Sequence, residues 1–208
     1  MNKTNSFKEW PSQQRLFYRM CGIANGLGGV IFALSYIFLP ASIRNSSVVI
    51  LCSLMTATVL IAIGLLGLYV RHVESISRFG FIGFTIALVG LVGMFSIYLL
   101  VMDVESSASL FETLVLGYPG LGNPNEAATY WYALFVICLV IGYLNLGWLM
   151  FRASLLPLAA ISVMMVGVVV FVLGLSNNTL CVVRPLGAVM FALALLWLGF
   201  MLWYEASD

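Results

Sequence analysis

Six long apolar stretches, separated by short polar segments, make up most of this chain. Each stretch is about as long as the roughly 20 residues that a helix needs to cross a bilayer. None of them alternates between apolar and polar positions as the strands of a membrane barrel do, and backbone groups in hydrocarbon must be satisfied within their own segment. The pattern therefore predicts an all-α integral membrane protein, a bundle of about six transmembrane helices. The predicted spans are residues 20–39, 48–70, 80–102, 130–151, 154–175 and 180–204.

Composition and charge agree with this pattern. The chain is 62% hydrophobic and only 8% charged, with a mean hydropathy of +1.09, whereas a soluble domain carries about 25% charged residues. A surface this apolar is stable only against lipid, so residues 20–204 are expected to form one transmembrane domain between an N-terminal segment, 1–19, and a tail, 205–208. The net charge of +1 provides no basic face, which argues against a nucleic-acid partner.

Lysine and arginine fall mainly on one side of the predicted bundle. Arg44 and Arg184 lie on one side, and the other seven basic residues lie on the opposite side: Lys3, Lys8, Arg15, Arg19, Arg71, Arg78 and Arg152. Cytoplasmic segments of membrane proteins are enriched in these residues, so both termini are predicted to be cytoplasmic, in a prokaryotic cell membrane. The stretches 67–71 and 78–84 resemble a hairpin of small bacterial six-span proteins, a resemblance that implies no particular activity.

The longest predicted loop, residues 103–129, carries acidic residues and no basic one. Ser109 and Glu112 have the spacing of a capping box, which predicts a short interfacial helix on the outer side that ends at Gly117. This loop is expected to be a connector. The alternatives are a docking surface for a partner protein and a divalent-cation site. The carboxylates available to such a site are Asp103, Glu105, Glu112 and Glu126.

Few polar side chains occur at the predicted membrane depth. Asn25 lies in the first span and Asn145 in the fourth, and both have glycine neighbours. An asparagine in lipid requires a hydrogen-bonding partner, so we expect both residues to make polar contacts between helices. The alternative is that they form a small polar site at the centre of the bundle.

Arg184 is the one basic residue placed inside a predicted span, about one turn from its outer end. A long basic side chain at that depth ordinarily reaches the lipid headgroups, and we expect this for Arg184. Two alternatives stay open. One is an ion pair or docking contact with Glu112, Glu126 or Asp103 of the outer loop, and the other is a site for an anionic ligand.

Small residues recur along several spans at helical spacing. Without a hydrophobic force between helices in lipid, close backbone approach at such positions holds a bundle together. The sequence therefore predicts packing seams between the helices, or between two copies of the chain. The seam residues are Gly22, Gly26, Ala57, Gly64, Gly67, Gly80, Gly83, Ala87, Gly90, Ala160, Gly167 and Gly174.

Residue types that carry catalysis are scarce. The only histidine, His72, is predicted in a solvated turn near Glu74, and the four cysteines lack metal-binding spacing. No catalytic residues, metal or cofactor are predicted, although bound lipid is expected. The first hypothesis is a non-catalytic subunit that packs against lipids, other membrane proteins or itself. The alternatives are a small transporter or permease-like protein for a neutral or lipophilic molecule, and a membrane enzyme acting on lipid.

Overall fold

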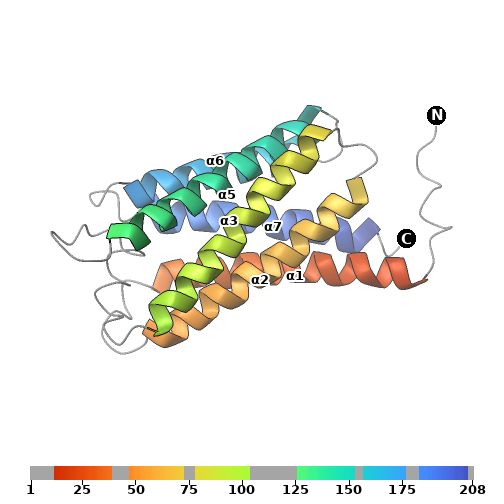
Figure 1. The fold of residues 1–208 in the computed structure, drawn as a ribbon. Helices are drawn as coiled ribbons and strands as arrows, with labels where there is room; N and C mark the ends of the chain where they lie inside the picture. The colour runs from red at the N-terminus through yellow and green to blue at the C-terminus, as the bar shows by residue number, and fades with distance from the viewer. Residues whose placement is uncertain are drawn as a thin grey trace.

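The described part of the chain is entirely helical (Figure 1). The computed structural model describes residues 12–38, 47–72, 78–103, 126–152, 157–176 and 183–205, and no strand occurs among them. The helices are α1 (Ser12–Phe38), α2 (Ser47–His72), α3 (Arg78–Asp103), α5 (Glu126–Arg152), α6 (Leu158–Ser176) and α7 (Val183–Glu205). This confirms the predicted all-α membrane bundle. The predicted interfacial helix lies outside the described residues.

Five of these helices, α1, α2, α3, α5 and α7, are long and apolar enough to cross a membrane. α6 is shorter, and Pro157 immediately precedes it. The Pro157 carbonyl accepts hydrogen bonds from the backbone N–H groups of Ala160 and Ile161, at 3.1 Å and 3.3 Å. The first turn of the helix therefore starts after the proline, and residues 154–156, where the predicted span begins, lie outside the described residues. With 19 residues, α6 is about 28 Å long, close to the thickness of the hydrocarbon core.

The helices form a closed ring. Each one packs against its neighbour in the sequence, and α7 returns to pack against α1. The contacts of α1 with α2 and α7, of α6 with α7 and of α3 with α5 are extensive, whereas the α2–α3 and α5–α6 contacts are much sparser. The ring thus consists of a four-helix unit, made of α2, α1, α7 and α6, and an α3–α5 pair that meets this unit along two loose interfaces.

Glycines explain why some neighbours pack so closely. A Cβ added to Gly22 of α1 would lie 2.5 Å from the Gly199 carbonyl oxygen of α7, and one added to Gly167 of α6 would lie 2.6 Å from the Phe191 nitrogen of α7. In the α3–α5 pair, a Cβ at Gly90 would lie 2.6 Å from a backbone nitrogen of α5. Only glycine permits these backbone approaches, and close packing is the main attraction between helices in lipid.

Most predicted seam residues face a neighbouring helix. Gly22, Gly26, Gly64, Gly67, Gly83, Gly90, Gly167 and Gly174 each lie against another helix. Ala57, Ala87 and Ala160 have no exposed surface, and Gly80 is buried as well. The eight glycines that face another helix therefore serve packing inside one chain.

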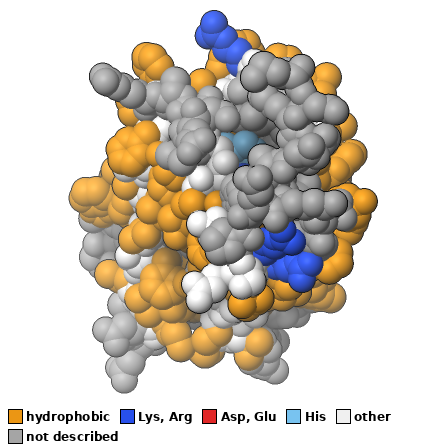
Figure 2. Space-filling view, turned by 90° about the vertical axis from the view of Figure 1, so that its right-hand side faces the viewer, with side chains coloured by type: hydrophobic (Ala, Val, Ile, Leu, Met, Phe, Trp, Pro, Cys, Tyr) orange, Lys and Arg blue, Asp and Glu red, His pale blue; other side chains and the backbone are white. Residues whose placement is uncertain are grey.

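The two ends of the bundle differ in chemistry. The arginine end contains the starts of α1, α3 and α6, and the ends of α2, α5 and α7, with Arg15, Arg19, Arg71, Arg78 and Arg152 among its residues. Figure 2 looks onto this end and shows basic side chains and the single histidine among apolar ones. His72 is only 5% exposed, and its Nδ1 lies 2.9 Å from the Leu68 carbonyl oxygen in the last turn of α2. The predicted solvated turn at His72 was therefore wrong, because α2 continues to this residue.

Candidate functional site

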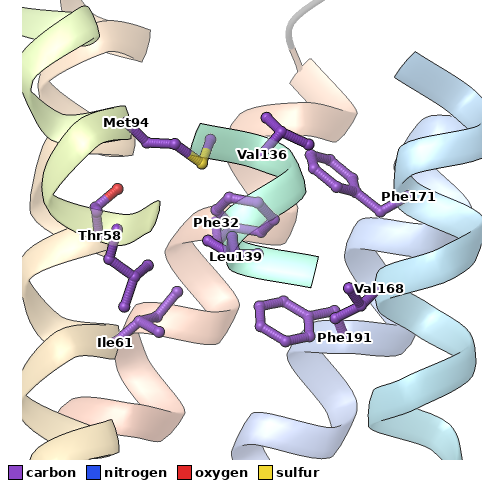
Figure 3. A pocket seen from close by; sticks show the side chains of 10 residues that line it. Phe32, Thr58, Ile61, Met94, Val136, Leu139, Val168, Phe171 and Phe191 are labelled. Carbon is purple, nitrogen blue, oxygen red and sulfur yellow. The ribbon is translucent and has the colours of Figure 1, made fainter. Parts of the chain in front are cut away.

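All six described helices meet around a small central cavity (Figure 3). Its volume is about 20 Å³, little more than the roughly 10–15 Å³ that one water molecule requires. Thr58 is the one polar residue in its wall, and its hydroxyl donates to the Leu54 carbonyl at 2.7 Å. The remaining wall is apolar, so the cavity offers a water molecule at most the Thr58 oxygen and is better suited to an apolar guest.

Aromatic rings form one side of this cavity. Phe32 of α1 contacts Phe171 of α6 and Phe191 of α7, with ring centroids 5.4 Å and 6.0 Å apart. Tyr143 of α5 meets Phe191 edge-on at 5.1 Å. Figure 3 shows the rings of Phe32, Phe171 and Phe191 turned toward the same space between the helices. This cluster joins α5 to the four-helix unit across the cavity.

Three tyrosines cover the cavity on the side that faces away from the arginine end of the bundle. Tyr36, Tyr98 and Tyr132 come from α1, α3 and α5, and they are 1%, 0% and 5% exposed. Each lies four residues, or one helical turn, from a residue of the cavity wall: Phe32, Met94 and Val136, respectively. The sequence therefore places a hydroxyl just beyond the cavity on three separate helices.

The three hydroxyls lie close to one another. Tyr36 interacts electrostatically with Tyr98 and Tyr132, and Tyr98 interacts with Tyr132. None of the three oxygens has a hydrogen bond of standard geometry within the described part of the chain. The Tyr36 hydroxyl is nevertheless within hydrogen-bonding reach of the Tyr98 and Tyr132 hydroxyls, so the three side chains form one polar group inside an apolar bundle.

Arg184 completes this group from α7. It is only 5% exposed, and its Nε and Nη2 donate to the Gly174 carbonyl of α6 at 3.3 Å and 3.2 Å. Its charge acts on the hydroxyls of both Tyr36 and Tyr132. We call Arg184, Tyr36, Tyr98 and Tyr132 the Arg–Tyr cluster.

The expected reach of Arg184 to the headgroups was wrong. A Cβ at Gly174 would lie 2.5 Å from the Arg184 nitrogen, so α6 and α7 touch at this point. The Gly174 carbonyl is also one of the last in α6, where carbonyls lack helical partners and cations are favoured. Inside the bundle the guanidinium therefore finds an acceptor. Glu112, and the side chains of Asp103 and Glu126, lie outside the described residues, so the predicted outer contact stays a prediction.

The two asparagines lie in different helix contacts. Asn25 has no exposed surface, and its Nδ2 donates to the Leu195 carbonyl of α7 at 3.0 Å. A Cβ at Gly64 of α2 would lie 2.5 Å from the Asn25 Oδ1. Asn145 of α5 instead lies against Gly83 of α3, with its Oδ1 2.9 Å from where a Cβ there would be. Neither asparagine lines the central cavity.

Among the described residues, no group of three or more histidine, cysteine or acidic side chains is placed to hold a metal ion. Cys21 is buried, Cys138 is half-buried and Cys52 is exposed, and all three are free thiols.

The apolar spans and the ring of helices define a polytopic membrane protein. No protein-family model, curated protein or solved structure matches the chain.

Proposed function

We propose that this protein binds a small lipophilic molecule at the centre of its bundle and lets it pass, as a small permease does. The observation that carries this proposal is the position of the Arg–Tyr cluster, one helical turn from an apolar cavity that all six described helices line. A polar group beside an apolar pocket is the usual composition of a ligand site. The proposed activity is binding and passage, without chemical conversion of the molecule.

The cost of the cluster supports a ligand. Phenylalanine would fill the positions of Tyr36, Tyr98 and Tyr132 with almost the same packing and without three buried hydroxyls. Polar and ionisable groups at membrane depth are expensive, and they commonly mark a substrate path. A ligand that satisfies these hydroxyls gives the three tyrosines a purpose that packing does not.

The two sparse helix interfaces, α2–α3 and α5–α6, provide the route by which the lipophilic molecule enters. The α3–α5 pair meets the four-helix unit only along the sparse α2–α3 and α5–α6 contacts. At the arginine end of the α2–α3 contact, the rings of Tyr69 and Phe84 stack with their centroids 4.3 Å apart. Packed bodies of this kind move as rigid units against one another in many transporters. A shift of the α3–α5 pair would open the cavity sideways toward the lipid.

Photolabelling tests this function. The full chain is placed in phosphatidylcholine nanodiscs with dodecanol that carries a diazirine in its chain, and the labelled residues are mapped by mass spectrometry. We expect saturable labelling of cavity residues such as Leu91 and Val136, which unlabelled dodecanol competes away. Labelling confined to lipid-facing positions such as Leu134, which is 45% exposed, would contradict the proposal.

A matched pair of variants sharpens this test. Val136 lines the cavity, and the next residue, Ile137, is 51% exposed. Val136→Trp fills the cavity and should abolish labelling at Leu91, whereas Ile137→Trp should leave it unchanged. If Val136→Trp does not fold, competition by unlabelled dodecanol at Leu91 decides, because a specific site saturates whereas contact with bulk lipid does not.

The small size of the cavity favours a second candidate, the non-catalytic subunit. A space of about 20 Å³ makes the bundle nearly solid, as a purely structural helix assembly would be. Extraction in a gentle detergent, followed by mass spectrometry of what co-purifies, separates the two functions. A second membrane protein in fixed ratio supports the subunit, whereas a chain that runs alone with a bound small molecule supports the permease.

A further inference from the structure

The start of α1 projects beyond the helices that pack against it (Figure 1). Gly67 of α2 meets Cys21, and α2 ends at residue 72, five residues later, which is level with Leu16 of α1. With 27 residues, α1 is about 40 Å long, whereas the hydrocarbon core of a bilayer is about 30 Å thick. The apolar run from residue 20 onward fills that core, so residues 12–19 extend into the layer of lipid headgroups.

A hollow lies on this projecting part of α1. Its volume is about 450 Å³, and its wall is formed by Ser12, Gln13, Arg15, Leu16 and Arg19. Arg19 contributes a guanidinium group to this wall, Ser12 a hydroxyl and Gln13 an amide. A phosphate group accepts hydrogen bonds from all three kinds of donor, and the bond from a guanidinium is the strongest of them. The hollow therefore has the chemistry of a phosphate site.

An apolar track leads from this hollow into the membrane. It consists of exposed residues that follow one another at steps of four, three and four, and so lie on one face of α1: Leu16, Met20, Ile23 and Leu27. From Leu16 to Leu27 the helix rises about 16 Å, close to half the thickness of the hydrocarbon core. Arg19 lies on the same face, because it comes four residues before Ile23. This face thus combines a cation among the headgroups with an apolar surface as deep as one leaflet.

We propose that this face of α1 binds an anionic phospholipid, with its phosphate in the hollow and one acyl chain along the apolar track. The first 19 residues of the sequence contain four basic residues and one acidic residue: Lys3, Lys8, Arg15 and Arg19 against Glu9. Such a segment attracts anionic lipids. Phosphatidylcholine carries a cation beyond its phosphate, which the same charges repel, whereas phosphatidylglycerol carries only the negative charge. The site lies apart from the central cavity and does not depend on the proposed function.

Two photoactivatable lipids that differ only in the headgroup provide the test. Phosphatidylglycerol or phosphatidylcholine, with a diazirine at the same carbon of one acyl chain, is added in equal small amount to the full chain in phosphatidylcholine nanodiscs. Phosphatidylglycerol should label Met20, Ile23 and Leu27 at least about fivefold more than phosphatidylcholine does, since one basic residue near the surface favours an anionic lipid by about that factor. Leu134, which is exposed on α5, should be labelled equally by both lipids.

Arg19→Gln should bring the ratio of the two lipids on the apolar track close to one. Arg152→Gln is the matched control, because Arg152 is exposed at the same end of the bundle but does not line the hollow. It should leave the ratio unchanged. If Arg19→Gln does not fold, Leu16→Glu decides. Leu16 is 62% exposed, and a negative charge there should abolish the preference for phosphatidylglycerol.

Three results would overturn this inference. Equal labelling of the apolar track by the two lipids would show ordinary lipid contact without a headgroup site. A preference that persists in both Arg19→Gln and Leu16→Glu would mean that the headgroup is held elsewhere. Competition by soluble glycerol phosphate that is as effective as competition by unlabelled phosphatidylglycerol would show a site for a free phosphate compound and not for a lipid.

Discussion

The guanidinium of Arg184 lies against the carbonyl oxygen of Gly174, with two N–H donors at 3.2 Å and 3.3 Å from one acceptor. This contact joins the end of α6 to the start of α7 and keeps a positive charge inside the bundle. The same glycine permits the contact, because any side chain there would meet the α7 backbone. One residue pair therefore links the packing of two helices to the position of the guanidinium beside the tyrosines.

Arg184→Gln should lower the free energy of unfolding. The variant removes the charge and at least one hydrogen bond to the Gly174 carbonyl, and a bond that involves a charged group contributes about 1.5–3 kcal/mol. Thermal unfolding in detergent measures the change. Arg152→Gln is the control, because Arg152 is exposed at the end of α5 and should alter stability little. Equal effects of the two variants would show that the buried contact carries no special stability.

Tyr98→Phe should stabilise the fold while it weakens binding of the lipophilic molecule. The hydroxyl is buried without a standard hydrogen bond in the described structure, so its removal relieves a penalty of about 1 kcal/mol. Thermal unfolding and dodecanol photolabelling are measured on the same preparation. Tyr130→Phe, at a position 73% exposed, should change neither quantity. A Tyr98→Phe variant that is less stable than the parent would mean that the hydroxyl is well satisfied.

Gly22→Ala should destabilise the contact between α1 and α7 by about 1–3 kcal/mol. The added methyl group would lie 2.5 Å from the Gly199 carbonyl oxygen, and backbone cannot move aside cheaply. Gly26→Ala gives the comparison, since its nearest neighbour is the flexible Leu196 side chain, at 3.2 Å. Unfolding in detergent should show that the Gly22→Ala variant is considerably less stable than the Gly26→Ala variant. The reverse order would contradict the backbone contact.

Locking the α2–α3 interface should close the cavity to lipophilic molecules. The rings of Tyr69 and Phe84 stack closely across it, so cysteines at both positions, in a background without other cysteines, should react with one short bifunctional thiol reagent. Cross-linking is expected to reduce dodecanol labelling of Val136 about tenfold, because the α3–α5 pair no longer separates from the four-helix unit. Reagent applied to either single-cysteine variant is the control. Unchanged labelling after complete cross-linking would exclude entry at this interface.

The helices and most of their packing residues were predictable from sequence, whereas the Arg–Tyr cluster was not. Apolar runs and glycine spacing follow directly from the demands of lipid, which each span must meet alone. The direction in which a side chain points around its helix axis does not follow from these demands. Because the spans are apolar on all sides, nothing in their pattern shows whether Tyr36 or Tyr98 faces lipid or the interior.

A partial signal for the cluster is present in the sequence. All four residues of the cluster lie near the predicted outer ends of their spans: Tyr36, Tyr98, Tyr132 and Arg184. The inward position of Arg184 still depends on how close α6 and α7 come at Gly174. Such a contact belongs to the folded bundle and not to either helix.

The return of α7 to α1 has a consequence for how the protein is made. The hydrogen bond from Asn25 to Leu195 joins positions 170 residues apart, so α1 leaves the ribosome long before its main partner exists. Until then α2 can already cover one side of α1, but the side that carries Gly22, Gly29 and the Asn25 amide group lacks its partner in α7. Closure of the ring is therefore a late event in biogenesis, and a chain cut short before α7 should present the uncovered side of α1 to membrane quality control.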